Sequence, residues 1–321
     1  MKKPFLTLIA LLTAVGSAFA VEDNTVEIVF SDGSATVTPA SNISSYVTSS
    51  VDGAHVKIVQ AETAGANTSG EILYILSGSS SNGSFYMEGS YKATLTLSGV
   101  TLTNPGGAAI DVQNGKRINV SIKNGTTNSL TDGENGDWKG CFVCKGHAEF
   151  KGKGTLTVNG KSGHGIWAKE YVEIKNCTIN IPSPAKDGIN CNQYFLMESG
   201  SLTITSPGDD GIQVSYKDDP PVEAEDTGNF TLTDGTVSIS SPANYCIKTD
   251  GTIKYNGGTR DFDTSNVLEN AATGINAVSV ETSDAEVTYD LGGRQLPKGS
   301  QLRKGVYIIR KDGKARKVIL K

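Results

Sequence analysis

Short apolar segments recur along the middle of the chain at a fixed spacing. Residues 154–158, 177–181 and 200–204 align without gaps at intervals of 23 residues, and a fourth copy, 235–239, follows 35 residues later. A second apolar track keeps the same intervals and consists of Val143, Ile166, Ile189, Ile212 and Ile247. Two tracks that share one period and one insertion indicate an internal structural repeat.

Each repeat reads as short alternating strands of β-branched residues that are interrupted by Gly, Asn, Asp and Pro. Helical periodicity of useful length is absent. Strands of four or five residues that recur every 23 residues can stack as successive coils, each about 4.8 Å from the next. The sequence therefore predicts an all-β fold, a right-handed parallel β-helix over residues 93–262. We expect residues 21–92 to form an N-terminal β cap region over its open first edge.

The two ends of the chain differ from this body. Residues 1–20 combine Lys2 and Lys3 with an apolar run and a small-residue cleavage site, which predicts a signal peptide and an exported mature chain without a transmembrane segment. Residues 21–286 carry a net charge of −15, whereas residues 287–321 carry +8. This asymmetry predicts a second domain at 274–321, after a linker at 263–273. The overall net charge of −5 argues against a nucleic-acid binder.

One face of the predicted coils carries candidate ligand-binding residues. If the second apolar track points inward, strand alternation turns the next residue of each coil outward, and these are Cys144, Trp167, Asn190, Gln213 and Lys248. Lys169 and Asn192, two positions further along their strands, face the same way. An exposed indole stacks on the C–H face of a sugar, and amides bond its hydroxyls, so this face is either a polysaccharide-binding surface or merely the solvated side of a solenoid.

A second set of candidates lies at the corner that precedes this face. Asp187 and Asp210 share one register position on adjacent coils, with Asp209 beside them. Carboxylates about 5 Å apart repel by roughly 1 kcal/mol in water and about 3 kcal/mol at an effective dielectric constant of 20. Bound calcium would remove this repulsion. Alternatively, the Asp-Gly pairs are ordinary turns whose carboxylates accept backbone N–H groups. The acidic insertion at 216–229 either adds metal ligands or is a solvated excursion.

Catalytic residues are harder to assign. The sequence has no metalloprotease, P-loop, serine-hydrolase or dinucleotide-binding motif, and its three histidines have no triad-like partner in the sequence. A lyase would need a metal and a basic residue, for which Lys169, Lys186 and Lys248 are the candidates. The five cysteines are odd in number, and we expect buried, unpaired thiols.

Several segments are recognisable beyond the repeat itself: the Asp-Gly-Ile corners and residues 73–84, 107–111, 125–132 and 154–158. Together they resemble the exported carbohydrate-binding β-helix family typified by a clostridial cellulose- and pectin-binding protein, similar in fold to calcium-dependent pectate lyases. The resemblance covers residues 25–262. It implies a right-handed parallel β-helix, calcium at Asp187 and Asp210 with Asp209 as neighbour, and binding of cellulose or a uronic-acid polymer without established catalysis.

The C-terminal segments form a second resemblance. Residues 274–280, 287–294, 305–310 and 317–321 alternate polar and apolar positions between glycine turns, which predicts a small β-sandwich. They look like the C-terminal sorting domain of the Bacteroidetes type IX secretion system. That resemblance implies the secretion machinery as a partner and an extracellular or cell-surface location, or the periplasm if the tail is not used.

We therefore expect an exported, non-catalytic polysaccharide-binding β-helix protein that binds acidic plant glycan through calcium. Two alternatives stay open. One is a calcium-dependent, pectate-like polysaccharide lyase, and the other is a surface adhesin or structural protein with no glycan ligand.

Overall fold

The computed structural model describes residues 21–61, 71–218, 220–271, 287–297, 302, 304–311 and 314–320. The chain forms two compact units, Met1–Ile275 and Asn276–Lys321. The expected signal peptide at 1–20 lies outside the described residues. No helix in the described part of the chain is long and apolar enough to span a membrane.

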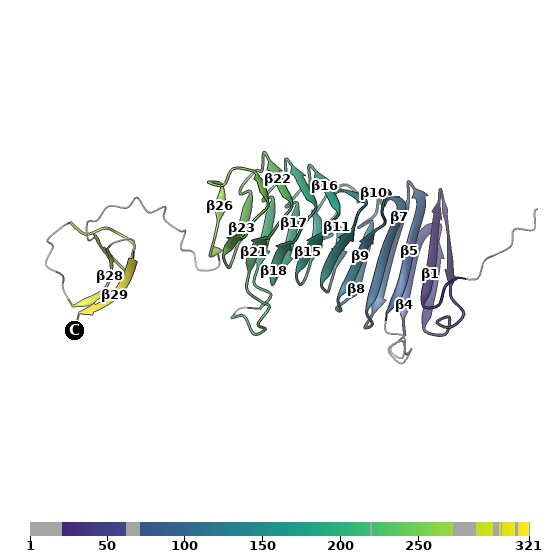
Figure 1. The fold of residues 1–321 in the computed structure, drawn as a ribbon, viewed down its shortest axis with the longest axis horizontal. Coiled ribbons are helices and arrows are strands. Elements are labelled where there is room, and N and C mark those ends of the chain that lie inside the picture. The colour runs from purple at the N-terminus through teal and green to yellow at the C-terminus, as the bar shows by residue number, and fades with distance from the viewer. Residues whose placement is uncertain are drawn as a thin grey trace, which may run out of the picture. The chain divides into compact units, whose positions relative to one another are not determined.

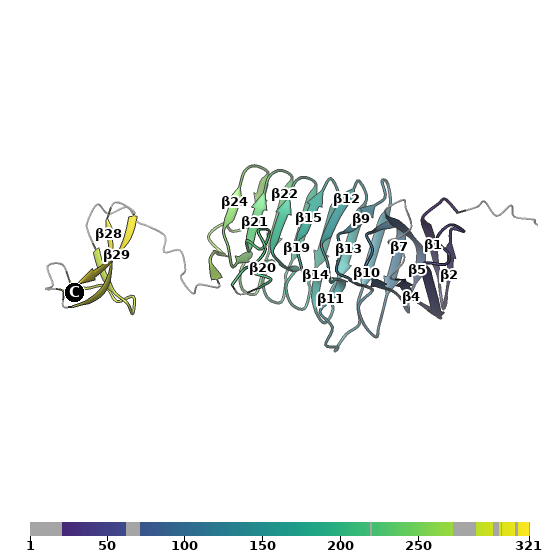
Figure 2. The same cartoon turned by 90° about the horizontal axis from the view of Figure 1, so that it is seen from below.

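The first unit is a parallel β-helix, as the repeat predicted (Figure 1). One full coil consists of the three short strands β14 (His164–Ala168), β15 (Val172–Lys175) and β16 (Thr178–Pro182). The next coil repeats them as β17 (Ile189–Asn192), β18 (Tyr194–Met197) and β19 (Ser201–Thr205). Each strand pairs in parallel with its equivalent, as in the pairings Ile166↔Ile189, Val172↔Phe195 and Thr178↔Ser201. Stacked coils therefore build three continuous faces, and Figures 1 and 2 view this stack from two sides.

The first face is a ten-stranded sheet, which carries the candidate ligand-binding residues. Its strands run in the order β26 (Val267–Leu268), β23 (Ile247–Thr249), β20 (Ile212–Ser215), β17, β14, β11 (Gly140–Cys144), β8 (Ile110–Asn114), β6 (Gly83–Gly89), β4 (Ala54–Gln60) and β3 (Val47–Asp52).

The other two faces belong to one sixteen-stranded sheet that folds over at β7 (Ala93–Thr103). One arm holds β9 (Ile118–Ile122), β12 (Ala148–Gly152), β15, β18, β21 (Asn229–Leu232) and β24 (Ile253–Tyr255). The other arm holds β10 (Thr127–Thr131), β13 (Thr155–Asn159), β16, β19, β22 (Thr236–Ser240) and β25 (Thr259–Asp261). The long β7 joins the arms because its first half pairs with β9 and its last residues pair with β10.

The N-terminal segment contributes coil strands as well as terminal strands. β1 (Thr25–Ser31) pairs in parallel with β5 (Ile72–Ser80), and β4 pairs in parallel with β6. Parallel stacking therefore begins before residue 93. The antiparallel strands β2 (Ser34–Pro39), on β1, and β3, on β4, end the ladders at this edge.

The core is filled by the inward residues of every strand, and the structure corrects one of them. The inward track of the ten-stranded sheet runs Phe142↔Ile166↔Ile189↔Ile212↔Ile247, so Phe142, not Val143, is its member on β11. An extra residue in the turn 152–154 causes the error, because Lys151 pairs with Lys175 whereas Thr155 pairs with Thr178. A slip of one residue exchanges the two faces of a strand.

The slip changes two outward positions on β11. Val143 pairs with Trp167 and takes the outward place that had been expected for Cys144. Cys144 is buried in the core, where burial raises the pKa of its thiol to about 12. All five cysteines are free and buried, as predicted.

The second unit contains β27 (Val287–Asp290), β28 (Gly305–Lys311) and β29 (Lys314–Leu320). These strands form a three-stranded antiparallel sheet, so the described part of the tail has one layer rather than the two of a sandwich. Residues 274–286, which carry part of the sorting-domain resemblance, lie outside the described residues.

The corner glycine of each Asp-Gly-Ile turn is required by close packing between coils. A Cβ atom added at Gly188 would lie 2.7 Å from the carbonyl oxygen of Gly211 and 2.6 Å from Cγ2 of Ile204. We expect Gly188→Ala to lower the free energy of unfolding by about 1–3 kcal/mol in denaturant titrations. Gly115→Ala is the matched control, because nothing lies within 4 Å of a Cβ atom there. Equal effects of the two substitutions would contradict the packing argument.

Candidate metal and carbohydrate site

The turns before β17 and β20 bring three aspartates together. One carboxylate oxygen from each of Asp187, Asp209 and Asp210 lies within 4.8 Å of the others. Asp187 and Asp210 are buried, with exposed fractions of 1% and 0%, and Asp209 is half-buried. In-register stacking places Asp187 and Asp210 at equivalent corners of adjacent coils, so the sequence spacing explains their proximity.

One oxygen of each buried carboxylate fixes the backbone of the following coil. Asp187 Oδ1 accepts the N–H of Asp210 at 3.0 Å, and Asp210 Oδ1 accepts the N–H of Tyr245 at 2.9 Å. The turn-capping alternative therefore holds for these two oxygens. It does not account for the second oxygen of each group.

The second oxygens differ in their partners. Asp187 Oδ2 accepts a hydrogen bond from Asn190 Nδ2 at 2.8 Å, and Nδ1 of His164 lies 3.2 Å from it. Asp210 Oδ2 is buried without a hydrogen-bond partner among the described residues. Its nearest cation is Lys248, whose Nζ lies 3.6 Å away. An unbonded carboxylate oxygen that is removed from water is costly, so this position favours an added cation.

Opposite pKa shifts follow from these partners. Burial acts to raise the pKa of Asp187, but its contact with the His164 ring and its hydrogen bond from Asn190 outweigh burial and leave that pKa below its ordinary value. Burial raises the pKa of Asp210. The backbone hydrogen bond from Tyr245 and the charge of Lys248 act to lower this pKa, but burial together with the charges of Asp187 and Asp209 keeps it above its ordinary value.

The expected carbohydrate-binding row adjoins this cluster. Trp167, Asn190, Gln213 and Lys248 are register neighbours on β14, β17, β20 and β23. Asn190 and Lys248 are also the side chains that contact Asp187 and Asp210. The two sets of candidates therefore form one continuous surface. Two positions further along β17 and β20, Asn192 pairs with Ser215.

The three candidate bases do not converge on one point. Lys169 follows β14 and is exposed, Lys186 precedes β17 and is exposed, and Lys248 lies on β23. Of the three, Lys248 alone makes an ion pair with the aspartate cluster among the described residues.

A hollow of about 600 Å³ lies over β8, β11 and β14. The sequence did not predict it. Trp167 and Lys169, two of the candidate carbohydrate-binding residues, line it, and so do Trp138, Lys139 and Lys145. Trp138 lies in the turn between β10 and β11, outside any strand repeat, so periodicity gave no signal for it. The only available signal was its residue type in a glycine-rich turn.

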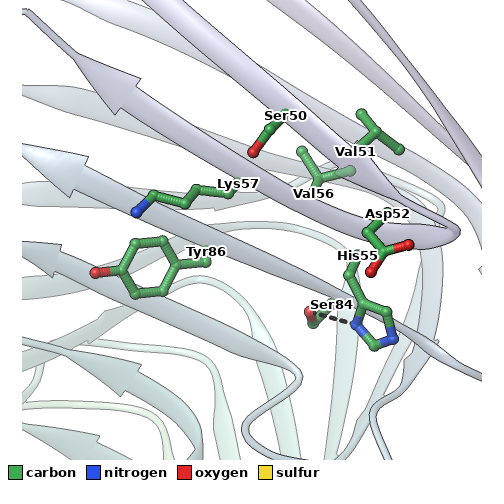
Figure 3. A pocket seen from close by; sticks show the side chains of 8 residues that line it. All are labelled: Ser50, Val51, Asp52, His55, Val56, Lys57, Ser84 and Tyr86. Atoms are coloured by element: carbon green, nitrogen blue, oxygen red, sulfur yellow. Dashed lines mark hydrogen bonds between the residues drawn. The ribbon is translucent and has the colours of Figure 1, made fainter.

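A smaller hollow of about 380 Å³ lies over β3, β4 and β6 of the same sheet (Figure 3). Lys57 Nζ lies 5.1 Å from the ring centroid of Tyr86 on the adjacent strand. His55 Nδ1 lies 2.9 Å from Ser84 Oγ. His55 and Ser84 are register partners on β4 and β6, which accounts for their contact.

The acidic insertion lies at the far end of β20, away from the aspartate cluster. Lys217 bonds both Glu170 and Glu223 at 3.1 Å, and Asp226 accepts the backbone N–H groups of residues 217 and 218. Gln193 donates to Glu223 at 2.6 Å. These contacts attach the loop to the two preceding coils, and the described carboxylates of the loop do not join the metal candidates.

Comparisons with known proteins agree with this description. A family profile described as carbohydrate-binding domain-containing protein matches residues 52–297. A carbohydrate-binding domain-containing protein of Acetivibrio thermocellus is 26% identical over 119 residues, which is 34% of this chain and 42% of that relative. The chain thus matches less than half the length of the relative.

A solved structure, that of the polysaccharide lyase-like protein from C. thermocellum in a gadolinium derivative, superposes with a TM-score of 0.57 and 21% identity. The superposition covers 76% of this chain and 99% of the solved chain. At this identity the likeness concerns the fold.

Matched amide substitutions at Asp187 and Asp210 should have opposite effects on stability. Asp187 has a lowered pKa, so its charge stabilises the fold above its unfolded pKa, and this contribution is lost as pH falls. Asp210 has a raised pKa, so its charge destabilises the metal-free fold, and stability falls as pH rises through that pKa. At neutral pH with chelator, thermal melts should show a lower Tm for Asp187→Asn and a higher Tm for Asp210→Asn, by roughly 2–4 °C per kcal/mol. A lower Tm for both would contradict this assignment.

Lys248 should compete with a metal ion for Asp210. We expect Lys248→Met to increase calcium affinity about tenfold or more, which corresponds to about 1.4 kcal/mol, because the competing ammonium group is removed. Calorimetric titration with calcium chloride measures this change. Lys169→Met removes the same charge from a residue that follows β14 and that makes no ion pair among the described residues, so it should leave the calcium affinity unchanged. Unchanged or weaker calcium binding by Lys248→Met would rule out the competition.

Proposed function

The chain belongs to the family of carbohydrate-binding domain-containing proteins, and we propose that it binds a polysaccharide along the outward face of its ten-stranded sheet with the help of a calcium ion. One observation carries the proposal. The buried, unbonded Oδ2 atom of Asp210 points into an acidic cluster that is continuous with the row beginning at Trp167.

The donor set fits a hard cation. The cluster offers carboxylate oxygens, and calcium accepts six to eight oxygen ligands in flexible geometry. Three carboxylates beside one ammonium group leave a net charge of about −2, which a divalent ion balances. Asp187, Asp209 and Asp210 are the residues that would hold the ion. When bound, calcium would supply a positive charge to a uronate carboxylate of the ligand.

Charge supports a coupling between metal and ligand. The body at residues 21–286 carries a net charge of −15 and would repel an anionic polymer. A calcium ion between the aspartates and a uronate would replace this repulsion with attraction. Binding of metal and acidic glycan should therefore be cooperative, each raising the affinity of the protein for the other.

A calcium-dependent lyase is the second candidate, supported by the likeness in fold to a polysaccharide lyase-like protein. In that case Lys248, beside the cluster, is the best-placed base, ahead of Lys169 and Lys186. We favour binding without cleavage because Lys248, the lysine beside the cluster, already forms an ion pair with Asp210. Export through residues 1–20, and surface delivery through a type IX sorting signal at 274–321, are parts of the same proposal.

Calorimetric titration of the whole protein with polygalacturonate and with a neutral glucan, each with calcium and with chelator, tests the proposal. We expect heat with polygalacturonate that increases with calcium, and no increase in the ultraviolet absorbance of unsaturated uronides. Asp210→Asn should abolish the effect of calcium, because the unbonded oxygen is lost. Growing absorbance would favour the lyase. Silence in all conditions would contradict both and leave an adhesin without a glycan ligand.

A further inference from the structure

Both tryptophans of the chain lie in one hollow. The sequence contains two tryptophans, Trp138 and Trp167, and both line the hollow of about 600 Å³ over β8, β11 and β14. Aromatic residues make up only 7% of the chain. Two indoles in one solvent-facing hollow are therefore a marked local concentration of stacking surface.

The Trp138 indole is held in a fixed orientation. Its Nε1 atom donates a hydrogen bond of 2.8 Å to Oδ2 of the buried Asp132. Its ring packs on Gly136, where an added Cβ atom would lie 1.7 Å from the ring. Ser162 ties the turn to the next coil by donating to Gly133 O at 2.9 Å and accepting from Gly136 N at 3.1 Å. The ring is thus pre-positioned, which lowers the entropic cost of stacking a ligand on it.

Three lysines surround the two indoles. Lys139 Nζ lies 4.1 Å from the ring centroid of Trp167. Lys145 and Lys169 are exposed, and each follows one member of the register pair Cys144↔Ala168. In the described part of the chain, none of these three ammonium groups lies within 4.0 Å of a carboxylate.

Two carboxylates also line the hollow, so lysines are in excess there. Asp137 is exposed on the turn, and Asp111 accepts a hydrogen bond from Gln113 at 2.6 Å. Within a body of net charge −15, this hollow is a place where cations outnumber anions. An indole pair selects a C–H face, and adjacent unpaired ammonium groups select an anion.

We propose that this hollow, the tryptophan subsite, binds one uronosyl residue of an acidic polysaccharide without a metal ion. The pyranose ring lies against Trp138 and Trp167, and its carboxylate lies between Lys145 and Lys169. The inference rests on the proposed function, since it names the sugar class that the same face recognises. The tryptophan subsite differs from the aspartate cluster because lysines, rather than calcium, balance the charge of the ligand at the Trp167 end of the row.

Intrinsic fluorescence tests the subsite directly, because the only two tryptophans of the chain are in it. The whole protein is titrated in chelator, at fixed ionic strength, with a galacturonate oligomer, its methyl ester and a cello-oligosaccharide. We expect a saturable change in tryptophan emission with the galacturonate oligomer, at an affinity about tenfold or more above that for the two neutral ligands. Equal affinity for acidic and neutral ligands would overturn the uronate assignment.

Variants separate the charge from the stacking surface. Lys169→Met should weaken binding of the galacturonate oligomer about tenfold and leave binding of the cello-oligosaccharide unchanged. Lys153→Met makes the same charge change on an exposed turn outside the hollow and should have no effect. Equal losses in the two lysine variants would overturn the subsite, because they would indicate a general charge effect.

Calorimetry run in parallel separates this inference from the proposed function. Heat of polygalacturonate binding without a change in tryptophan emission would overturn the tryptophan subsite and leave the proposed function intact. Neither heat nor emission change, with or without calcium, would overturn both.

Discussion

In-register stacking of successive coils is the constraint on which the rest of the structure depends. Parallel pairing places equivalent residues of neighbouring coils about 4.8 Å apart, whatever their chemistry. Inside, this builds the continuous ladder from Phe142 to Ile247, whose side chains are all buried. Outside, the same geometry brings polar and charged residues of equal register together. The stacking that stabilises the core therefore also gathers the candidate ligand-binding side chains on one face.

The aspartate corner shows how the fold tolerates like charges at this spacing. Asp187 and Asp210 each give one oxygen to the backbone of the next coil, so both carboxylates help to hold the corner in place. Their remaining oxygens differ, because Asn190 and His164 contact that of Asp187, whereas among the residues that the structure describes the second oxygen of Asp210 has only the more distant Lys248. One charge is well stabilised and the other is not. This inequality is what makes the cluster a candidate for cation binding, since a fully bonded cluster would gain little from an ion.

Much of the fold could be predicted from the 23-residue period, because a solenoid repeats its backbone as well as its core. The coils before β11 do not follow this period, and within the predicted tracks the period failed at one point. The extra residue in the turn 152–154 lies between the two tracks, so an alignment anchored on residues 154–158 placed Val143 inward and Cys144 outward. Register on β11 depends on the length of that turn, which apolar spacing does not reveal. The inward position of Cys144 became visible only with the strand pairing.

The candidate site was predictable to the extent that it repeats. Asp187 and Asp210 occupy one register position on adjacent coils, and so do the residues from Trp167 to Lys248, so the sequence could place them together. The contact of Asn190 with Asp187, and that of Lys248 with Asp210, could not be predicted, because they depend on how side chains cross between a corner and a strand. Trp138 was missed for a related reason. Its position depends on its hydrogen bond to Asp132 and its packing on Gly136, which are specific to one turn.

The two ends of this surface have different proposed roles, because the tryptophan subsite would bind a sugar by stacking and the aspartate cluster would bind calcium. From Trp167 to Lys248 there are three strand-to-strand steps, or about 14 Å, so one extended chain is long enough to contact both ends. Occupation of the tryptophan subsite would hold the next sugars near the aspartate cluster at a high effective concentration, which lowers the affinity that the metal end must supply by itself. A short ligand would occupy one end only and lose this gain. Length of the ligand, as much as its charge, therefore decides how strongly metal and glycan binding are coupled on this face.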